Sequence, residues 1–439
     1  MKRDIYKDLT LWRDSQYRKP LVLRGARQTG KTYILQEFGK REYRQCHYFN
    51  FEEDSRLASF FNGNLDTNRI INDLSLYRKT DIHKRDDIII FDEVQECNDA
   101  LNSLKYFNEH NNGYHIAAAG SLLGVHMSKP KSFPVGKVDF VDLFPMTFYE
   151  FLDAVGENRY RAYLENIDKS MPIPEAFHNE LTRLLQRYYL VGGMPEAVSR
   201  HAADPHLANY RTVQKTILDS YSLDFAKHAP ASDIPKLSLV WESLPMQLAR
   251  ENKKFLFSVV KAGARAREYE NALTWLSNAG LIYRCPLVEI PKVPIAAYRN
   301  LSSFKIYVSD VGLLGALAKL PADTMPTDQA IFTEFHGAFV ENYVAQHIVA
   351  TMGMDLHYWK NAGQAAEVDF ILQHDSMILP IEVKSGMNIR SKSLSFYRSK
   401  YNPCLAIRTS LRNLKFDGKV LNVPLYAIQS LPNILNTCT

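Results

Sequence analysis

A phosphate-binding pattern, in which a second glycine is followed by a lysine and a hydroxyl residue, marks the N-terminal part of this chain. It consists of Gly25, Ala26, Arg27, Gln28, Thr29, Gly30, Lys31 and Thr32. An apolar run precedes the pattern and a helical pattern follows it, and the glycines let successive backbone N–H groups turn toward one phosphate. We expect Lys31 to reach the β- and γ-phosphates of a nucleotide and the Thr32 hydroxyl to bind Mg²⁺.

Two acids, Asp92 and Glu93, follow the apolar run 88–91. Such a run predicts a central parallel strand that is buried on both faces, and ligands bind at the carboxyl ends of such strands. We expect Asp92 to hold Mg²⁺ through water and Glu93 to polarise an attacking water. The alternative is a strand that ends in a solvated acidic turn, but the phosphate-binding pattern favours the first interpretation. The two motifs predict an ATPase core that uses ATP and Mg²⁺.

A third strand is predicted at residues 115–119, and Gly120 and Ser121 follow it. ATPases of this kind place a residue that senses the γ-phosphate at the end of this strand, so Ser121 is a candidate for that role. A Gly-Ser pair after a strand also occurs as an ordinary turn. Both interpretations of Ser121 stay open.

The C-terminal part carries a second group of chemically active residues on two predicted strands, 366–372 and 378–385. Their spacing predicts a hairpin, and side chains that are two residues apart share one face of a strand. Asp369, Glu382 and Lys384 then converge on one spot. Asp369 and Glu382 would bind Mg²⁺ and Lys384 would orient a nucleophile, which suits cleavage of a phosphodiester. The alternative is a salt-bridged pair of strands without catalytic chemistry.

The composition is that of an ordinary globular protein. The 439 residues include 53 Lys and Arg against 48 Asp and Glu, so the net charge of +5 is too small to indicate a nucleic-acid partner by itself. The five cysteines are scattered, which predicts reduced thiols and no zinc site. No apolar stretch approaches the length of a membrane span, and the N-terminus lacks the pattern of a signal peptide. We therefore expect a cytoplasmic protein with no membrane partner.

Changes in the hydrophobic pattern divide the chain into four regions. We predict a P-loop ATPase domain at residues 1–146, a helical region at 147–232, a winged-helix-like domain at 233–322 and a C-terminal domain at 323–439. The winged helix is predicted because two helical patterns, a basic connector and a strand follow one another.

Basic residues cluster near the helix of the winged-helix-like domain that would face DNA. They are Lys253, Lys254, Lys261, Arg265 and Arg267. They predict either a DNA-facing surface or a solvated basic face on a packing module. The small net charge of the chain favours the second interpretation.

With these motifs, the chain resembles a large prokaryotic family of AAA-type ATPases that join a P-loop domain to a C-terminal domain related to restriction endonucleases. The matching segments are 25–32, 88–93, 120–121, 143–145, 148–152, 192–197, 307–313, 339–342, 367–370 and 381–384. The resemblance implies an α/β fold class with a restriction-endonuclease-like last domain, and it adds Glu341 as a helix-borne catalytic acid. Lys137 departs from the family's usual arginine and cannot make the two-pronged contact of an arginine finger.

Two functions follow from this resemblance. In the first, ATP hydrolysis controls a metal-dependent nuclease-like domain that acts on nucleic acid, with catalytic residues Glu341, Asp369, Glu382 and Lys384. In the second, the chain is a nucleotide-dependent switch or scaffold whose nuclease-like domain binds nucleic acid or protein and cleaves nothing. The candidate partners are ATP, DNA or RNA, and further copies of the same chain.

Overall fold

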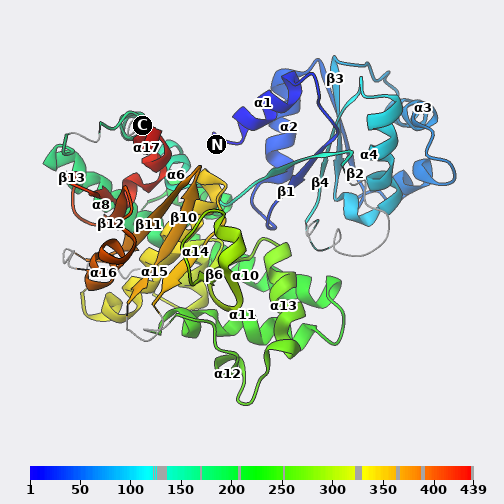
Figure 1. Cartoon of the computed structure of the whole chain (residues 1–439). Coiled ribbons are helices and arrows are strands. Elements are labelled where there is room, and N and C mark those ends of the chain that lie inside the picture. Colours follow the sequence, from blue (N-terminus) through cyan, green and yellow to red (C-terminus); the bar gives the residue numbers. More distant parts are fainter. Residues whose placement is uncertain are drawn as a thin grey trace. The chain divides into compact units, whose positions relative to one another are not determined.

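The computed structural model describes residues 1–121, 123, 125, 136–168, 171–205, 209–250, 253–321, 329–361, 366–386 and 391–436. The chain divides into two structural units. Residues 2–144 with residues 278–280 form the N-terminal unit, and residues 145–277 and 281–439 belong to the second unit (Figure 1). The predicted domain boundary between residues 322 and 323 lies outside the described residues.

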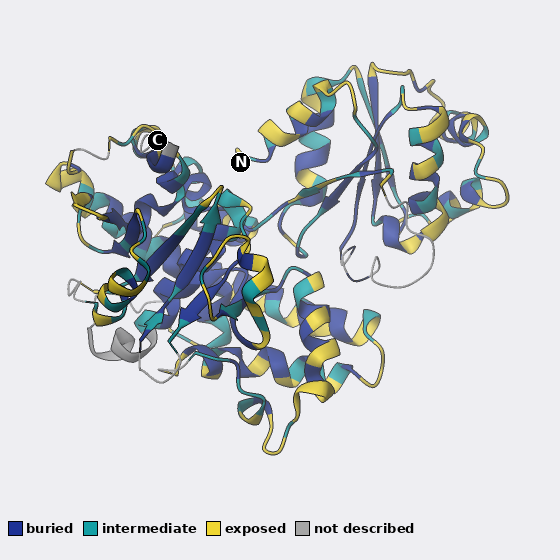
Figure 2. Ribbon diagram, in the orientation of Figure 1, coloured by how far each residue is buried: buried dark blue, intermediate teal, exposed yellow. Residues whose placement is uncertain are grey.

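The N-terminal unit is built on a parallel sheet with the strand order β2-β3-β4-β1-β5. Its strands are β1 (Leu21–Arg24), β2 (Gln45–Asn50), β3 (Asp87–Asp92), β4 (His115–Ala119) and β5 (Asp139–Asp142). All six residues of β3 are buried, as an apolar run at the centre of a parallel sheet requires (Figure 2). The parallel sheet that the sequence predicts for a P-loop ATPase is therefore confirmed.

Helices cover both faces of this sheet (Figure 1). They are α1 (Tyr6–Asp14), α2 (Lys31–Glu42), α3 (Thr67–Arg78) and α4 (Asn98–His110), together with the short helices η1 (Ser55–Phe61) and η2 (Val94–Glu96). Since side chains alternate along a strand, Ile88 and Ile90 of β3 pack in the core formed with α1 and α2. Ile89 and Phe91 pack in the other core, which α3 and α4 cover. The carboxyl end of β3 is thus held firmly between two layers.

The second unit begins with a helical region. The helices are α6 (Phe148–Ala154), α7 (Asn158–Glu165), α8 (Glu175–Val191), α9 (Pro195–Ala203), α10 (Asn209–His228), α11 (Ile234–Leu248), α12 (Phe257–Val260) and α13 (Ala266–Asn278). The first of them starts with a capping box, in which Thr147 and Glu150 satisfy each other's backbone N–H groups. This agrees with a helical region after the P-loop unit.

Two mixed sheets complete the second unit. The first has the order β7-β6-β8-β9, and the second has the order β10-β11-β12-β14-β13. Their strands are β6 (Ile282–Val288), β7 (Arg299–Val308), β8 (Tyr358–Lys360), β9 (Glu367–Val368), β10 (Phe370–His374), β11 (Met377–Val383), β12 (Ala406–Ser410), β13 (Lys415–Asp417) and β14 (Val420–Pro424). The remaining helices are η3 (Ile295–Tyr298), α14 (Val311–Leu317), α15 (Gln329–His347), η4 (Ile348–Met352), α16 (Lys392–Tyr401), η5 (Leu425–Ser430) and α17 (Leu431–Asn436). Taken with the helical region, the described part of the chain is therefore of the α/β class.

The predicted C-terminal hairpin is present, but one of its two predicted strands is divided into two shorter strands. β10 and β11 pair in antiparallel fashion, with Phe370 opposite Ile381. The single strand predicted at 366–372 is instead broken at Asp369 into β9 and β10, which belong to different sheets. The carboxylate of Asp369 accepts a hydrogen bond from the backbone N–H of Val383, at 2.8 Å, and this bond replaces a ladder contact at the break.

The elements predicted for a winged helix occur in the expected order. α11, α12 and α13 precede the antiparallel pair β6–β7. However, β6 also pairs in parallel with β8, so the β6–β7 hairpin belongs to a sheet that continues into the C-terminal region. The winged helix therefore stays an interpretation of this segment.

Candidate functional site

The phosphate-binding pattern forms the loop between β1 and α2. Gly25 and Gly30 adopt φ values of 149° and 93°, which favour glycine, and a Cβ on Gly25 would lie 2.2 Å from the backbone oxygen of Leu143. Gln28 has a φ of 65°, a left-handed conformation that is uncommon for residues other than glycine. Glycine is therefore required at position 25 for two reasons: its backbone conformation and the close approach of the Leu143 backbone.

The side chain of Lys31 lies inside this loop. Its Nζ donates hydrogen bonds to the backbone oxygens of Gly25, at 3.0 Å, and Ala26, at 2.8 Å. The buried Thr29 also closes the loop, because its hydroxyl donates to the oxygen of Ala26, at 2.9 Å. The ammonium group is therefore held where a phosphate group would lie, on the concave side of the backbone.

Arg3 supports the loop from outside and was missed by the sequence analysis. Its guanidinium donates to the backbone oxygens of Thr29, at 2.9 Å, and Phe144, at 2.7 Å. The side chain is buried. No local signal identifies an arginine near a chain terminus as a partner of a loop so distant in sequence.

Thr32 and Asp92 meet at the carboxyl ends of the central strands. The Thr32 hydroxyl donates to Asp92 Oδ2, at 2.6 Å, and the Tyr48 hydroxyl donates to the same oxygen, at 2.8 Å. Burial raises the pKa of Asp92, although these two hydrogen bonds oppose that effect. A hydroxyl and a carboxylate side by side are the hard oxygen donors that Mg²⁺ prefers, so Thr32 and Asp92 fit this ion.

Glu93 follows with a φ of 48°, which turns its side chain away from the strand direction. Glu93 Oε2 accepts hydrogen bonds from Gln95 Nε2, at 2.5 Å, and from the backbone N and the hydroxyl of Ser121, at 3.2 and 3.1 Å. Burial opposes ionisation of Glu93, but the hydrogen bonds from Gln95 and Ser121 outweigh it and lower its pKa. Glu93 is therefore a carboxylate at neutral pH, as a general base requires.

The loop residues, Asp92, Glu93 and Ser121 are thus gathered in one unit. Tyr48 and Gln95 belong to the same group and were not predicted. The structure brings Tyr48 to the site because β2 pairs with β3 and places Asn50, two residues from Tyr48, opposite Asp92. The sequence pattern alone does not give this register.

The second predicted site contains a buried lysine that was also missed. Lys305, on β7, has a side chain that is 1% exposed, and its Nζ lies 3.1 Å from Glu341 Oε1, 2.7 Å from Glu367 Oε1 and 4.0 Å from Asp369 Oδ1. Burial disfavours its charged form, but the neighbouring carboxylates outweigh it and raise the pKa of Lys305 well above its ordinary value. The ammonium group of Lys305 therefore lies among three carboxylates. We call these three residues and the nearby Glu382 the carboxylate cluster: Glu341, Glu367, Asp369 and Glu382.

Glu341 lies on α15 and is paired on two sides. Lys253 and the hydroxyl of Tyr307 also donate hydrogen bonds to it. Burial alone would raise its pKa, but the charges of Lys253 and Lys305 hold the pKa of Glu341 below its ordinary value. Lys253 was predicted to belong to a basic surface; the structure corrects this, since its ammonium is turned inward to a buried acid.

Asp369, Glu382 and Lys384 are brought together as the hairpin predicted. Lys384 Nζ lies 2.7 Å from Glu382 Oε1, and the hydroxyl of Ser391 donates to the same oxygen, at 2.8 Å. Burial and the charges of Glu341 and Glu382 raise the pKa of Asp369. Within the part of the chain that the structure describes, no group of three or more His, Cys, Asp or Glu residues is arranged to hold a metal ion.

The arrangement favours ion pairing over metal binding at the carboxylate cluster. Lys253, Lys305 and Lys384 already contact its carboxylates. Lys305 and Tyr307 could have been noticed in the sequence, because they alternate with apolar residues on a strand, and a lysine on the buried face of a strand needs a partner.

The other features give little evidence of a site. Lys261, Arg265 and Arg267 are exposed.

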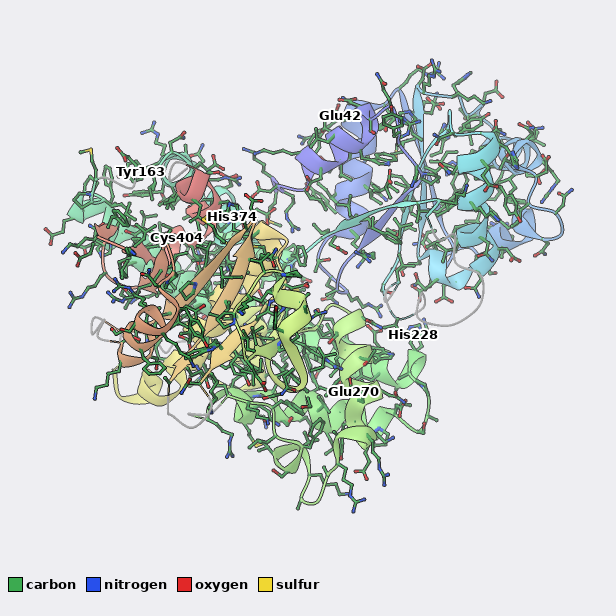
Figure 3. All side chains as sticks on the ribbon, in the orientation of Figure 1. Glu42, Tyr163, His228, Glu270, His374 and Cys404 are labelled. Carbon is green, nitrogen blue, oxygen red and sulfur yellow. The ribbon has the colours of Figure 1, made fainter. Side chains whose placement is uncertain are left out.

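The cysteines among the described residues are free thiols; Cys46, Cys97 and Cys285 are partly or fully buried, and Cys404, labelled in Figure 3, is exposed. Among the helices that the structure describes, none is long and apolar enough to cross a membrane.

Three protein-family models match the chain. Residues 17–152 match a model described as an AAA domain. Residues 182–324 and 336–428 match two models described as domains of unknown function, DUF8612 and DUF4143. No curated protein matches the sequence.

Solved structures resemble the chain only distantly. The Walker-type ATPase PABY2304 of Pyrococcus abyssi is 14% identical with a TM-score of 0.45, over 72% of this chain and 95% of that one. The RuvB Holliday junction branch migration motor of Thermotoga maritima is 14% identical with a TM-score of 0.31, over 65% and 90%. The ORC1 protein of Aeropyrum pernix, solved in complex with DNA, is 13% identical with a TM-score of 0.27, over 72% and 91%. The AAA-domain match and the parallel sheet support a P-loop ATPase in the N-terminal unit, while the C-terminal match carries no assigned function.

Proposed function

We propose that this protein binds ATP with Mg²⁺ and hydrolyses it. The observation that carries the proposal is the meeting of Thr32 and Asp92, whose side chains are 2.6 Å apart beside the phosphate-binding loop. The hydroxyl lies in the first turn of α2 and the acid at the carboxyl end of β3. They are the pair that P-loop ATPases use to hold the metal of a bound nucleotide.

Each residue of the site has a distinct part in this reaction. The backbone N–H groups of the loop and Lys31 would bind the phosphates. Thr32 and Asp92 would hold Mg²⁺, which supplies positive charge to the phosphate oxygens when it is bound. Glu93 would accept a proton from the attacking water. Ser121, which lies against Glu93, would respond to the γ-phosphate.

ATP turnover by the purified full chain tests this proposal. Lys31→Ala should abolish ATP binding, because the phosphates lose their nearest positive charge. Glu93→Gln should keep binding and lower turnover by about 10²–10⁴-fold, the usual contribution of a general base. Lys40→Ala, which removes an exposed lysine from the same helix, is the matched control and should behave as the parent. Parent-like turnover in Glu93→Gln would refute the assignment of the base.

We further propose that the nucleotide state controls the C-terminal region. Two forms of this control remain. A metal-dependent nuclease-like domain is supported by Asp369, at the break that precedes β10, and Glu382, on the paired strand β11. A non-catalytic domain that binds nucleic acid or protein is supported by two lysines beside the carboxylates that would bind the metal: Lys305 lies 4.0 Å from Asp369, and Lys384 lies 2.7 Å from Glu382. We favour the second form on this observation.

The two forms are separated by a cleavage assay. The purified chain is incubated with ATP, with Mg²⁺ or Mn²⁺, and with several forms of DNA and RNA. Cleavage that Asp369→Asn and Glu382→Gln both abolish, while ATP turnover persists, would establish the nuclease. Binding without cleavage that is unaffected by these two changes would establish the non-catalytic form. Lys360→Gln, which alters a half-exposed lysine near the cluster, is the control.

A further inference from the structure

We propose that Gln95 is a positioning residue for hydrolysis, whose side-chain amide holds Glu93 in the orientation that a general base requires. The inference rests on the proposed ATP hydrolysis and adds a residue to it. Gln95 lies on η2, directly after the acids that end β3, and its side chain is buried. Three observations carry the proposal.

The first observation is that the donors converge on one oxygen only. Gln95 Nε2 and both donors of Ser121 contact Glu93 Oε2. Among the residues that the structure describes, none donates a hydrogen bond to Glu93 Oε1. One carboxylate oxygen is therefore fixed and the other is left to accept a proton. A base that is held in this way has its second oxygen aimed in one direction, which is what proton abstraction from a single water molecule needs.

The second observation concerns the other end of the same amide. Gln95 Oε1 is buried and has no hydrogen-bond partner within the described part of the chain. An unpaired buried carbonyl is unfavourable, so it persists only where another contact compensates for it. The charge-assisted bond to Glu93, at 2.5 Å, is that contact. Turning the amide over would place its carbonyl oxygen against the carboxylate, so Glu93 dictates the orientation of Gln95.

The third observation is the space that Gly120 leaves for this amide. A Cβ on Gly120 would lie 2.0 Å from Gln95 Oε1. The φ of Gly120 is not among the positive values that favour glycine, so its backbone conformation does not explain the residue. The lack of a side chain at this position is instead what allows the Gln95 amide to reach Glu93.

The competing explanation is that Gln95 merely fills space at the end of the sheet. A space-filling residue would affect stability and nucleotide binding, whereas a positioning residue affects the chemical step through Glu93. The variant Gln95→Met keeps the length of the side chain and removes its hydrogen bonds. The quantities to measure are kcat, KM for ATP, the equilibrium Kd for ATP and the melting temperature.

The closing experiment is a double-mutant cycle on ATP turnover by the full chain. Gln95→Met should lower kcat about tenfold or more, a part of the 10²–10⁴-fold that a general base contributes, while KM and Kd stay within about twofold. In a Glu93→Gln background, Gln95→Met should have no further effect on the residual rate, because the residue acts through Glu93. Equal losses of kcat in both backgrounds, or a loss in ATP affinity with kcat unchanged, would overturn the proposal.

Gly120→Ala gives a second route to the same result without altering Gln95. The added methyl group displaces the amide, so kcat should fall as in Gln95→Met, again only when Glu93 is present. This variant decides the matter if Gln95→Met fails to fold, and parent-like kcat in Gly120→Ala would count against the proposal. The parent and Lys31→Ala are assayed alongside. No ATP turnover by the parent refutes the proposed function itself, whereas parent turnover that is insensitive to both variants refutes only the role of Gln95.

Discussion

Lys305 donates a 3.1 Å hydrogen bond to Glu341, and neither side chain reaches solvent: they are 1% and 4% exposed. One residue lies on β7 and the other on α15, so the pair joins a strand to the helix beside it. Removing Lys305 withdraws the ammonium group that Glu341, Glu367 and Asp369 share, and Glu341 then keeps only Lys253 as a lysine partner. Carboxylates that lose a buried positive partner are strongly destabilising.

Lys305→Met should therefore destabilise the second unit by about 3–5 kcal/mol, the cost of breaking a buried pair from one side. The free energy of unfolding is obtained from urea titration of the full chain, with a probe that reports on the second unit. Lys360→Met is the matched control, since Lys360 is 40% exposed and lies 3.8 Å from Glu367. A partly exposed pair of this kind contributes about 1 kcal/mol or less. Equal effects of the two changes would contradict the buried pairing.

Metal ions should not stabilise the second unit through the carboxylate cluster, because lysines already contact its carboxylates. A metal bound there at a hundredfold excess over its Kd would add about 2.7 kcal/mol to the free energy of unfolding. We expect the parent and Asp369→Asn to respond identically to added Mn²⁺ in thermal unfolding. A stabilisation by Mn²⁺ that the parent shows and Asp369→Asn loses would instead establish a metal site and favour the nuclease.

Tyr48→Phe should weaken the response of the ATPase to Mg²⁺ without removing nucleotide binding. The Tyr48 hydroxyl donates to Asp92 at 2.8 Å, and residues that orient a metal ligand are commonly worth about 10–100-fold in metal affinity or activity. The measurement is the Mg²⁺ concentration that gives half-maximal ATP turnover. Tyr17→Phe, which alters an exposed tyrosine, is the control. An unchanged Mg²⁺ requirement in Tyr48→Phe would show that the hydrogen bond does not orient Asp92.

Acid should destabilise the second unit through His347. The ring is fully buried, its Nε2 accepts from the backbone N–H of Phe148, at 2.9 Å, and its Nδ1 donates to the oxygen of Tyr343, at 2.9 Å. Burial lowers the pKa of His347 from 6.5 to about 3, so the unfolded chain binds the proton more readily than the folded chain. The stability from the neutral ring is thus complete above pH 6.5 and falls as the pH drops toward 3.

The slope of this loss is at most about 1.4 kcal/mol per pH unit for one proton. His347→Gln should be less stable at pH 7 but should show a shallower decline between pH 6.5 and pH 4. His374→Gln, a change at the less buried end of β10 that Figure 3 labels, serves as the control. Parallel pH profiles for the parent and His347→Gln would exclude His347 as the source of the acid sensitivity.

Local sequence patterns predicted the parts of the structure that depend on neighbours in the chain. The phosphate-binding loop, the buried β3 and the hairpin β10–β11 follow from residues a few positions apart. The pairing of Tyr48 with Asp92 depends instead on how β2 is registered against β3. Lys305 and Lys253 meet Glu341 because elements far apart in sequence pack together. Periodicity can indicate that a lysine is buried but not which distant residue it meets, and for this reason the sequence analysis did not predict the contacts of Lys305 and Lys253 with Glu341.

The break at Asp369 constrains the length of the chain at this position. β9 on one side of the break belongs to the four-stranded sheet, and β10 on the other side belongs to the five-stranded sheet. Since successive side chains of a strand point in opposite directions, losing or gaining one residue here would turn every side chain of β10 to the opposite face. Phe370 and Leu372 would exchange faces with Ile371, and since all three are buried, each would enter a core that is packed around a different side chain. The break at Asp369 thus fixes which faces of β10 meet the two sheets, and we expect Asp369→Asn to be tolerated more readily than an insertion or deletion at this position.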